Sequence, residues 1–243
     1  MSKKKKISGE CAYCGKPATT LDHVPPQGLF AKPRIGLIKV PACQKCNNGT
    51  SLDDEFLKRL SLNSGAERSR DAIQTSESLL RSIARPEAQR MKQGLFETIK
   101  PVNVWSTSGL LWLGKSYKMT LDGERMSRIV RKVIRGLYFH VTGKRLPPQY
   151  VVETHVVGRE VPTESIRENE RQILDVSETI IGDQAFSFRY VLAPQDEFLS
   201  VWRLEFYGVS RYMGYTILRQ EHESTFLSLQ DFPEEPASPL ATD

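Results

Sequence analysis

Four cysteines constrain the fold of this chain more than any other feature. All lie in the first 46 residues as two Cys-x-x-Cys units, "CAYC" at Cys11–Cys14 and "CQKC" at Cys43–Cys46, with 28 residues between them. A gap of two residues lets both thiolates of a unit point at one tetrahedral ion, so the spacing predicts a closed structural zinc site. Zinc binding would supply folding free energy to a segment with few large apolar side chains, and the closed site leaves no position for a substrate.

The remaining composition is that of an ordinary globular protein. Of 243 residues, 39% are hydrophobic and 26% charged, which is enough for a sizeable core. No apolar run approaches the roughly 18 to 20 residues that a membrane helix needs, and no apolar segment follows the basic start "MSKKKKISGE". We therefore expect a cytoplasmic protein with no membrane partner, and in that reducing compartment paired cysteines favour a metal over disulfides.

Positive charge is concentrated in the cysteine-containing segment. Residues 1–50 hold nine lysines and arginines against two acidic residues, a net charge of +7, whereas the whole chain carries only +5. A basic module of this kind is expected to meet a polyanion. The candidate nucleic-acid contacts are Lys3, Lys4, Lys5, Lys6 and Lys45. For the Lys3–Lys6 run, a solvated surface without a partner is an equal alternative.

Periodicity along the chain predicts an α+β fold. We expect a zinc-bound module at residues 1–62, a mixed α/β body with antiparallel strands at 63–230, and a loose acidic tail at 231–243. Helices are predicted from near Ser51, over 66–93 with a break at Pro86, over 125–143 ending at Gly143, and over 164–176. A hairpin is predicted within 97–123, and strands at 150–158, 185–193, 198–208 and 213–219. The inner face of the 66–93 helix is expected to consist of Ile73, Leu79, Leu80 and Ile83.

Three polar residues beside the cysteine units have a chemical meaning together. His23 has a side chain whose ordinary pKa lies near neutrality, so it can act as a general base toward water. Asp22 and Asn47 offer hard oxygen ligands for Mg²⁺ or a similar ion, which could polarise a phosphate and stabilise a departing oxyanion. Because each lies close to a cysteine unit, one zinc ion would bring them together. A base, a cation site and a basic surface describe phosphodiester hydrolysis.

The stretches "CAYC", "LDHVPP" and "CQKCN" together resemble the HNH endonucleases that are supported by a zinc ribbon. The similarity covers about Cys11 to Leu60, a quarter of the chain. It implies a ββα-metal core in which His23 is the general base and Asp22 and Asn47 are catalytic residues that hold Mg²⁺ or Mn²⁺. It also implies DNA as the partner, cut to leave 5′-phosphate and 3′-hydroxyl ends.

One element of that pattern is missing. Many HNH sequences have an asparagine shortly before the second cysteine unit, where it braces the loop of the base, but "GLIKVPAC" contains none. Asn48 is the nearest substitute in sequence, and the brace stays unassigned. Asp54 is a further candidate metal ligand, since helical spacing would put it on one face with Asn47. The alternative, which the pattern favours, is a capping box between Ser51 and Asp54.

The main hypothesis is thus a metal-dependent DNA endonuclease. The alternative is a zinc-ribbon nucleic-acid binding protein that has lost catalysis. The body could serve homodimer formation, target recognition or inhibition. The other histidines, His140, His155 and His222, are expected to be packed or surface residues.

Overall fold

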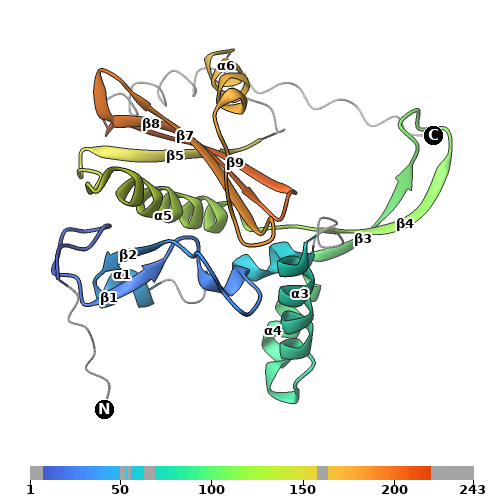
Figure 1. The fold of residues 1–243 in the computed structure, drawn as a ribbon. Helices are drawn as coiled ribbons and strands as arrows, with labels where there is room; N and C mark the ends of the chain where they lie inside the picture. Colours follow the sequence, from blue (N-terminus) through green and yellow to red (C-terminus); the bar gives the residue numbers. More distant parts are fainter. Residues whose placement is uncertain (1–7, 50–52, 54–55, 63–68, 158–163, 220–243) are drawn as a thin grey trace.

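The computed structural model describes residues 8–49, 53, 56–62, 69–157 and 164–219, and within them the chain is α+β with antiparallel sheets (Figure 1). The strands are β1 (Thr20–His23), β2 (Lys39–Ala42), β3 (Ile99–Trp105), β4 (Trp112–Met119), β5 (Tyr150–Val156), β6 (Thr179–Ile181), β7 (Phe186–Ala193), β8 (Asp196–Phe206) and β9 (Ser210–Leu218). The α-helices are α1 (Gln44–Asn48), α3 (Arg70–Ile83), α4 (Gln89–Phe96), α5 (Gly123–Thr142) and α6 (Glu164–Gln172). Short 3-10 helices are η1 (Gln27–Leu29), η2 (Lys58–Leu62), η4 (Pro86–Ala88) and η5 (Ile173–Asp175).

Helix α5 is the central element of the molecule. It lies between the β1–β2 hairpin on one side and a five-stranded antiparallel sheet of order β5-β9-β8-β7-β6 on the other (Figure 1). Its apolar side chains recur every three or four residues, so they form a stripe that is buried along the helix. The buried members are Met126, Ile129, Val130, Val133, Ile134, Leu137 and Tyr138.

The cysteine-containing module and the body share one hydrophobic core. Val24 and Val40 of the module belong to the same buried cluster as Leu137 of α5 and Trp202 of the sheet. Contact is closest at Gly136, where an added Cβ would lie 2.6 Å from Val24 Cγ2 and 3.1 Å from Tyr13 Oη. A glycine is needed there because any side chain would push the module away from α5.

The predicted helix over 66–93 is two helices. Helix α3 ends at Ile83, and Pro86 begins η4 before α4, so the predicted break is confirmed. The predicted inner face was wrong at Ile73 and Leu80, which are 41% and 50% exposed. The buried face instead begins with Asp71, Ala72 and Thr75, and the Thr75 hydroxyl donates to the Leu29 carbonyl at the end of η1.

Most of the other predicted elements are confirmed. The predicted 125–143 helix is α5, and Gly143 ends it with a left-handed φ of 70°. The 97–123 hairpin is β3–β4, the four predicted strands are β5, β7, β8 and β9, and the helix at 164–176 is α6 with η5. The short edge strand β6 was not predicted. The proposed helix start at Ser51 and the tail at 231–243 lie outside the described residues, although Asp53 is helical.

Among the described residues, no helix combines the length and the apolar character that crossing a bilayer demands.

Candidate functional site

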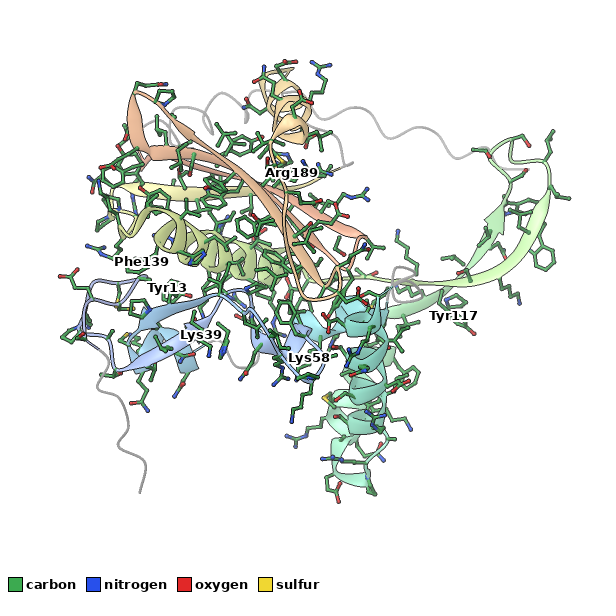
Figure 2. The ribbon with its side chains drawn as sticks, in the orientation of Figure 1. Tyr13, Lys39, Lys58, Tyr117, Phe139 and Arg189 are labelled. Carbon is green, nitrogen blue, oxygen red and sulfur yellow. The ribbon has the colours of Figure 1, made fainter. Side chains whose placement is uncertain are left out.

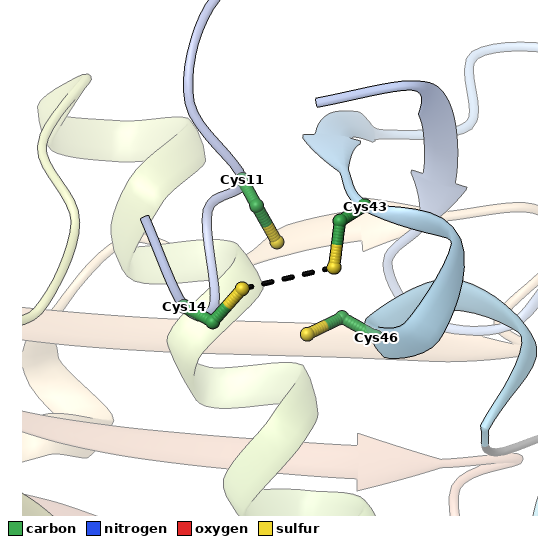
Figure 3. Close-up of side chains that lie close together, drawn as sticks. All are labelled: Cys11, Cys14, Cys43 and Cys46. Atoms are coloured by element: carbon green, nitrogen blue, oxygen red, sulfur yellow. Dashed lines mark hydrogen bonds between the residues drawn. The ribbon is translucent and has the colours of Figure 1, made fainter. Parts of the chain in front are cut away.

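The four cysteines converge on one point (Figure 3). Their Sγ atoms all lie within 4.8 Å of one another, and the Cys14 and Cys43 sulfurs are 3.7 Å apart. Four thiolates bound to one zinc ion at about 2.3 Å would be separated by about 3.8 Å in a tetrahedron. The cluster could therefore hold a metal ion such as zinc, as the spacing predicts.

Each cysteine unit is shaped by its local backbone. The first is a turn in which the Gly15 N–H donates to the Cys11 carbonyl at 3.0 Å, with Gly15 at a φ of 75°. The second opens α1, where Cys43 is the N-cap in extended conformation. The backbone N–H of Cys46, followed by the neighbouring thiols, lowers the pKa of Cys43 to about 7, which favours the thiolate that a metal requires.

Asp22 faces α5 from strand β1. Its side chain is buried, and its Oδ2 atom lies 2.8 Å from Lys132 Nζ and accepts a hydrogen bond from Tyr13 Oη at 2.9 Å. Burial, and then the Asp22 carboxylate, raises the pKa of Tyr13, so the tyrosine stays protonated and remains a donor. Asp22 is thus the polar link between the module and the central helix.

His23, the next residue, leaves β1 from the opposite face, because successive side chains of a strand alternate between its faces. It also borders a small cavity against α5. It lines an open pocket of about 780 Å³ whose other polar members include Lys32, Arg34 and Lys39. Burial lowers the pKa of His23 below its ordinary value of 6.5, and Lys39 and Arg34 lower it further against the opposing effect of Asp22. The imidazole is therefore neutral at pH 7 and able to accept a proton.

A small cavity of about 40 Å³ separates His23 from α5, with Asp53, Arg128 and Lys132 in its lining. Asp53 is bound there by two arginines of the helix, at 2.8 Å from Arg125 Nε and 3.3 Å from Arg128 Nε. Burial raises the pKa of Asp53, but the hydrogen bonds from the two arginines outweigh it and leave the pKa lowered. These ion pairs attach Asp53 to the central helix.

Asn47 braces strand β1 from helix α1. Its side-chain amide donates to Thr20 Oγ1 at 3.0 Å and to the Leu21 carbonyl at 3.2 Å. Asn47 therefore links α1 to β1, the strand that carries His23, whereas Asn48 is exposed on α1. This contact could not be predicted from the sequence, because only the fold brings α1 beside β1.

The residues expected to bind a catalytic cation are already engaged in other contacts. The Oδ2 atom of Asp22 is neutralised by Lys132, and the amide of Asn47 is committed to β1. Asp54 lies outside the described residues. In the described part of the chain, the cysteines are the one group of three or more His, Cys, Asp or Glu side chains close enough to share an ion. Asp22 Oδ2 and the side-chain N–H group of Asn47 are thus used in contacts within the protein.

Cations that the sequence analysis did not single out line pockets beside His23. Lys3–Lys6 lie outside the described residues, and Lys45 is exposed on α1 without lining the His23 pocket. An adjoining pocket of about 470 Å³ shares Lys32 and Arg34 with the His23 pocket, and the two form what we call the basic groove. Figure 2 shows Lys39 and Lys58 from these pockets on the same side of the molecule. The cations of the basic groove are Lys32, Arg34, Lys39, Lys58 and Arg81. Glu77 also lines the groove and pairs with Arg81 at 3.4 Å.

The remaining histidines play no part in this site. His155 contacts Glu170 at 2.8 Å and stacks on Tyr215 with ring centroids 5.7 Å apart, and His140 is exposed on α5. His222 lies outside the described residues. His23 is thus the histidine that lines the basic groove among those that the structure describes.

Comparisons with known proteins identify no relative of the chain. No family model, no curated protein and no solved structure matches the chain.

Proposed function

We propose that this chain is an endonuclease that hydrolyses phosphodiester bonds of DNA with His23 as general base. The observation that carries the proposal is the position of a neutral imidazole in the wall of an open pocket lined by Lys32, Arg34 and Lys39. A neutral imidazole can take a proton from water, and the cations beside it favour an anionic substrate. A phosphodiester supplies both the negative charge and the electrophilic phosphorus that the activated water would attack. The ββα order of β1, β2 and α1 beside the cysteine cluster is consistent with the HNH resemblance.

In the proposed reaction, His23 takes a proton from water as the oxygen attacks phosphorus. The 3′-oxygen then leaves and the phosphate stays on the 5′ side of the break. Lys39 is the closest fixed cation in the strand pair, since it is the register partner of His23, and Arg34 lines the same pocket. Their positive charge favours binding of the phosphate in the ground state and stabilises the additional negative charge of the transition state.

Participation of Mg²⁺ or Mn²⁺ belongs to the same proposal and has a structural requirement. Asp22 can accept a divalent ion only if Lys132 gives up its contact at 2.8 Å. Replacing Lys132 by Met should therefore strengthen Mn²⁺ binding, measured by electron paramagnetic resonance of the zinc-loaded protein. Unchanged Mn²⁺ binding in Lys132→Met would show that Asp22 is not a cation ligand.

A second candidate function is that of a nucleic-acid binding protein without catalysis. The observation that favours it is the pairing of Asp22 Oδ2 with Lys132 and of the Asn47 side chain with β1. Apart from the four cysteines, no group of three or more His, Cys, Asp or Glu side chains in the described residues lies close enough to share an ion. The basic groove would then bind DNA, and His23 would only contribute to its wall.

Nicking of a supercoiled plasmid separates the two candidates. We expect zinc-loaded protein to nick the plasmid, with Mg²⁺, Mn²⁺ and Ni²⁺ each tested as activator. Nicking that is lost in His23→Ala supports the endonuclease. Plasmid binding without nicking under all of these conditions would establish the binding protein instead.

A further inference from the structure

The hairpin formed by β3 and β4, which we call the ribbon, extends away from the body of the molecule (Figure 1). Its base is anchored by Ile99 and Met119, which pack against Leu79, Ile83 and Leu95 of the α3–α4 pair. Beyond that base the ribbon has no third strand in the described residues. A two-stranded hairpin alone is at best marginally stable in water, so its exposed part is expected to need a partner.

The far end of the ribbon exposes large apolar side chains. Trp105 and Trp112 are register partners at this end, and they are 53% and 52% exposed. Leu110 and Leu111, next to the turn, are 87% and 62% exposed. Contiguous apolar exposure of this size marks a binding surface rather than ordinary surface variation.

The charges of the ribbon indicate what binds there. From residue 98 to residue 121 the chain contains Lys100, Lys115 and Lys118 and no aspartate or glutamate. Lys100 and Lys118 lie directly opposite each other in the strand register. Like charges in that position destabilise a strand pair unless an anion lies between them. A partner with phosphates satisfies these lysines, whereas a purely apolar protein surface does not.

We propose that the ribbon is a second nucleic-acid binding element that grips duplex DNA held in the basic groove. The lysines contact phosphates, and the tip of Leu110, Leu111 and Trp112 enters a groove of the duplex and packs against base edges. A two-stranded ribbon fits the major groove, and apolar side chains are used as wedges between base steps in the minor groove. This inference rests on DNA being the substrate of the proposed endonuclease.

The location of the ribbon agrees with that role. The α3–α4 pair that anchors it also carries Arg81, a member of the basic groove. With eight residues, β4 is about 25 Å long, close to three quarters of a turn of B-DNA. The ribbon would therefore contact DNA beyond the base pairs next to His23 and extend the length of duplex that the protein covers.

Tryptophan fluorescence of the full chain tests the proposal directly. Of the three tryptophans, Trp105 and Trp112 are at the ribbon tip and Trp202 is fully buried, so quenching by acrylamide reports on the ribbon. We expect a 30-base-pair duplex, added without Mg²⁺ or Mn²⁺, to protect the tryptophans from acrylamide. Leu110→Ser with Leu111→Ser should weaken duplex binding about tenfold or more, measured by fluorescence anisotropy. Ile180→Ser with Val191→Ser, which changes exposed residues of β6 and β7, is the matched control and should bind normally.

The lysines give an independent measurement. Replacing Lys100, Lys115 and Lys118 by Gln should reduce the salt dependence of binding by about 0.9 in the log–log slope for each phosphate that is no longer neutralised. Normal duplex binding by these variants, without protection of the tryptophans in the wild type, would overturn the ribbon proposal and leave the endonuclease proposal standing. Protection that grows with protein concentration in the absence of DNA, together with doubling of the mass, would assign the ribbon to a dimer contact and also overturn it. Failure of the wild type to bind any duplex would overturn both proposals.

Discussion

The two faces of strand β1 differ in what surrounds them. On the inner face Asp22 is buried, paired with Lys132 and hydrogen-bonded to Tyr13, and the nearby contact at Gly136 leaves no room for another atom. On the outer face His23 opens into the basic groove. Neighbouring residues of one short motif therefore have different surroundings: one joins the module to the body, and the other is available to a substrate.

This difference predicts two kinds of mutational effect. Changes on the inner face should lower stability and alter cleavage only through the fold. Changes on the outer face should lower cleavage or binding and leave the folded state intact. The cysteine cluster should affect both faces, because β1 and β2 lie in the sequence between its two Cys-x-x-Cys units.

The largest effect is expected from the cluster itself. Cys43→Ser should prevent zinc binding, because it removes one of the four thiolates that would complete a tetrahedral site. Because module and body share one core, unfolding should then begin at a lower temperature for the whole chain, not only for the module. Elemental analysis and calorimetry measure both effects, and a zinc chelator added to wild type should reproduce them. Full stability without zinc would contradict the assignment.

The next largest effect separates the outer face from the inner one. His23→Ala should reduce plasmid nicking by about 10²- to 10⁴-fold, because a positioned general base contributes that much to a rate. Zinc content, melting temperature and duplex affinity should stay close to wild type. His140→Ala, which changes an exposed histidine of α5, is the matched control. If His23→Ala lost zinc or unfolded, the histidine would be structural and the endonuclease proposal would lose its main support.

Removing charges from the basic groove should weaken binding by a smaller amount. Arg34→Gln with Lys39→Gln is expected to lower duplex affinity at low salt by about ten- to a hundredfold and the salt slope by up to about 1.8. Lys16→Gln with Lys45→Gln removes the same charge from exposed lysines of the module that do not line the pocket. Equal reductions in the two double variants would mean that DNA responds to net charge and not to the groove.

On the inner face, the packing of the module against α5 can be tested by adding a single carbon at Gly136. Gly136→Ala should destabilise the protein by about 2 kcal/mol, because the new Cβ would lie 2.6 Å from Val24 Cγ2 in a close-packed contact. Gly94→Ala in α4 is the control, since nothing lies within 4 Å of the added carbon, and it should be neutral or slightly stabilising. Chemical denaturation measures both free energies. Equal free energies of unfolding for Gly136→Ala and Gly94→Ala would show that the module does not pack closely against α5 at Gly136.

Local patterns in the sequence were sufficient to predict much of this molecule. The cysteine spacing indicated the metal cluster, and the repeat of apolar residues along α5 indicated both the helix and its buried stripe. What failed depends on contacts between distant segments. Nothing in the local sequence "LDHVPP" predicts that Lys132 pairs with Asp22, because β1 and α5 come together only in the folded protein. Ile73 and Leu80 were assigned to a core for the same reason.

The groove was missed for a different physical reason. Lys32 and Arg34 belong to an irregular loop, where side-chain direction follows no period that a sequence could reveal. Net charge pointed to residues 1–50, which contain Lys32, Arg34 and Lys39, but it could not distinguish these pocket-lining cations from Lys45, which lies on α1 and does not line the pocket.

The smallest effect, and the most specific to His23, is the pH dependence of cleavage. A general base works only when it is deprotonated, so the rate should fall as pH drops through the pKa of His23. Because burial, Lys39 and Arg34 lower that pKa, the midpoint should lie below 6.5, and the rate should change by less than about twofold between pH 8 and 6.5. Single-turnover cleavage at saturating protein measures the midpoint without interference from binding. Lys39→Gln removes one of the two cations that lower the pKa, so the midpoint should move upward toward 6.5, whereas Lys45→Gln should leave it in place. A midpoint above pH 6.5, or a midpoint that does not change in Lys39→Gln, would mean that another group is the general base. The outer face of β1 would then only bind the substrate.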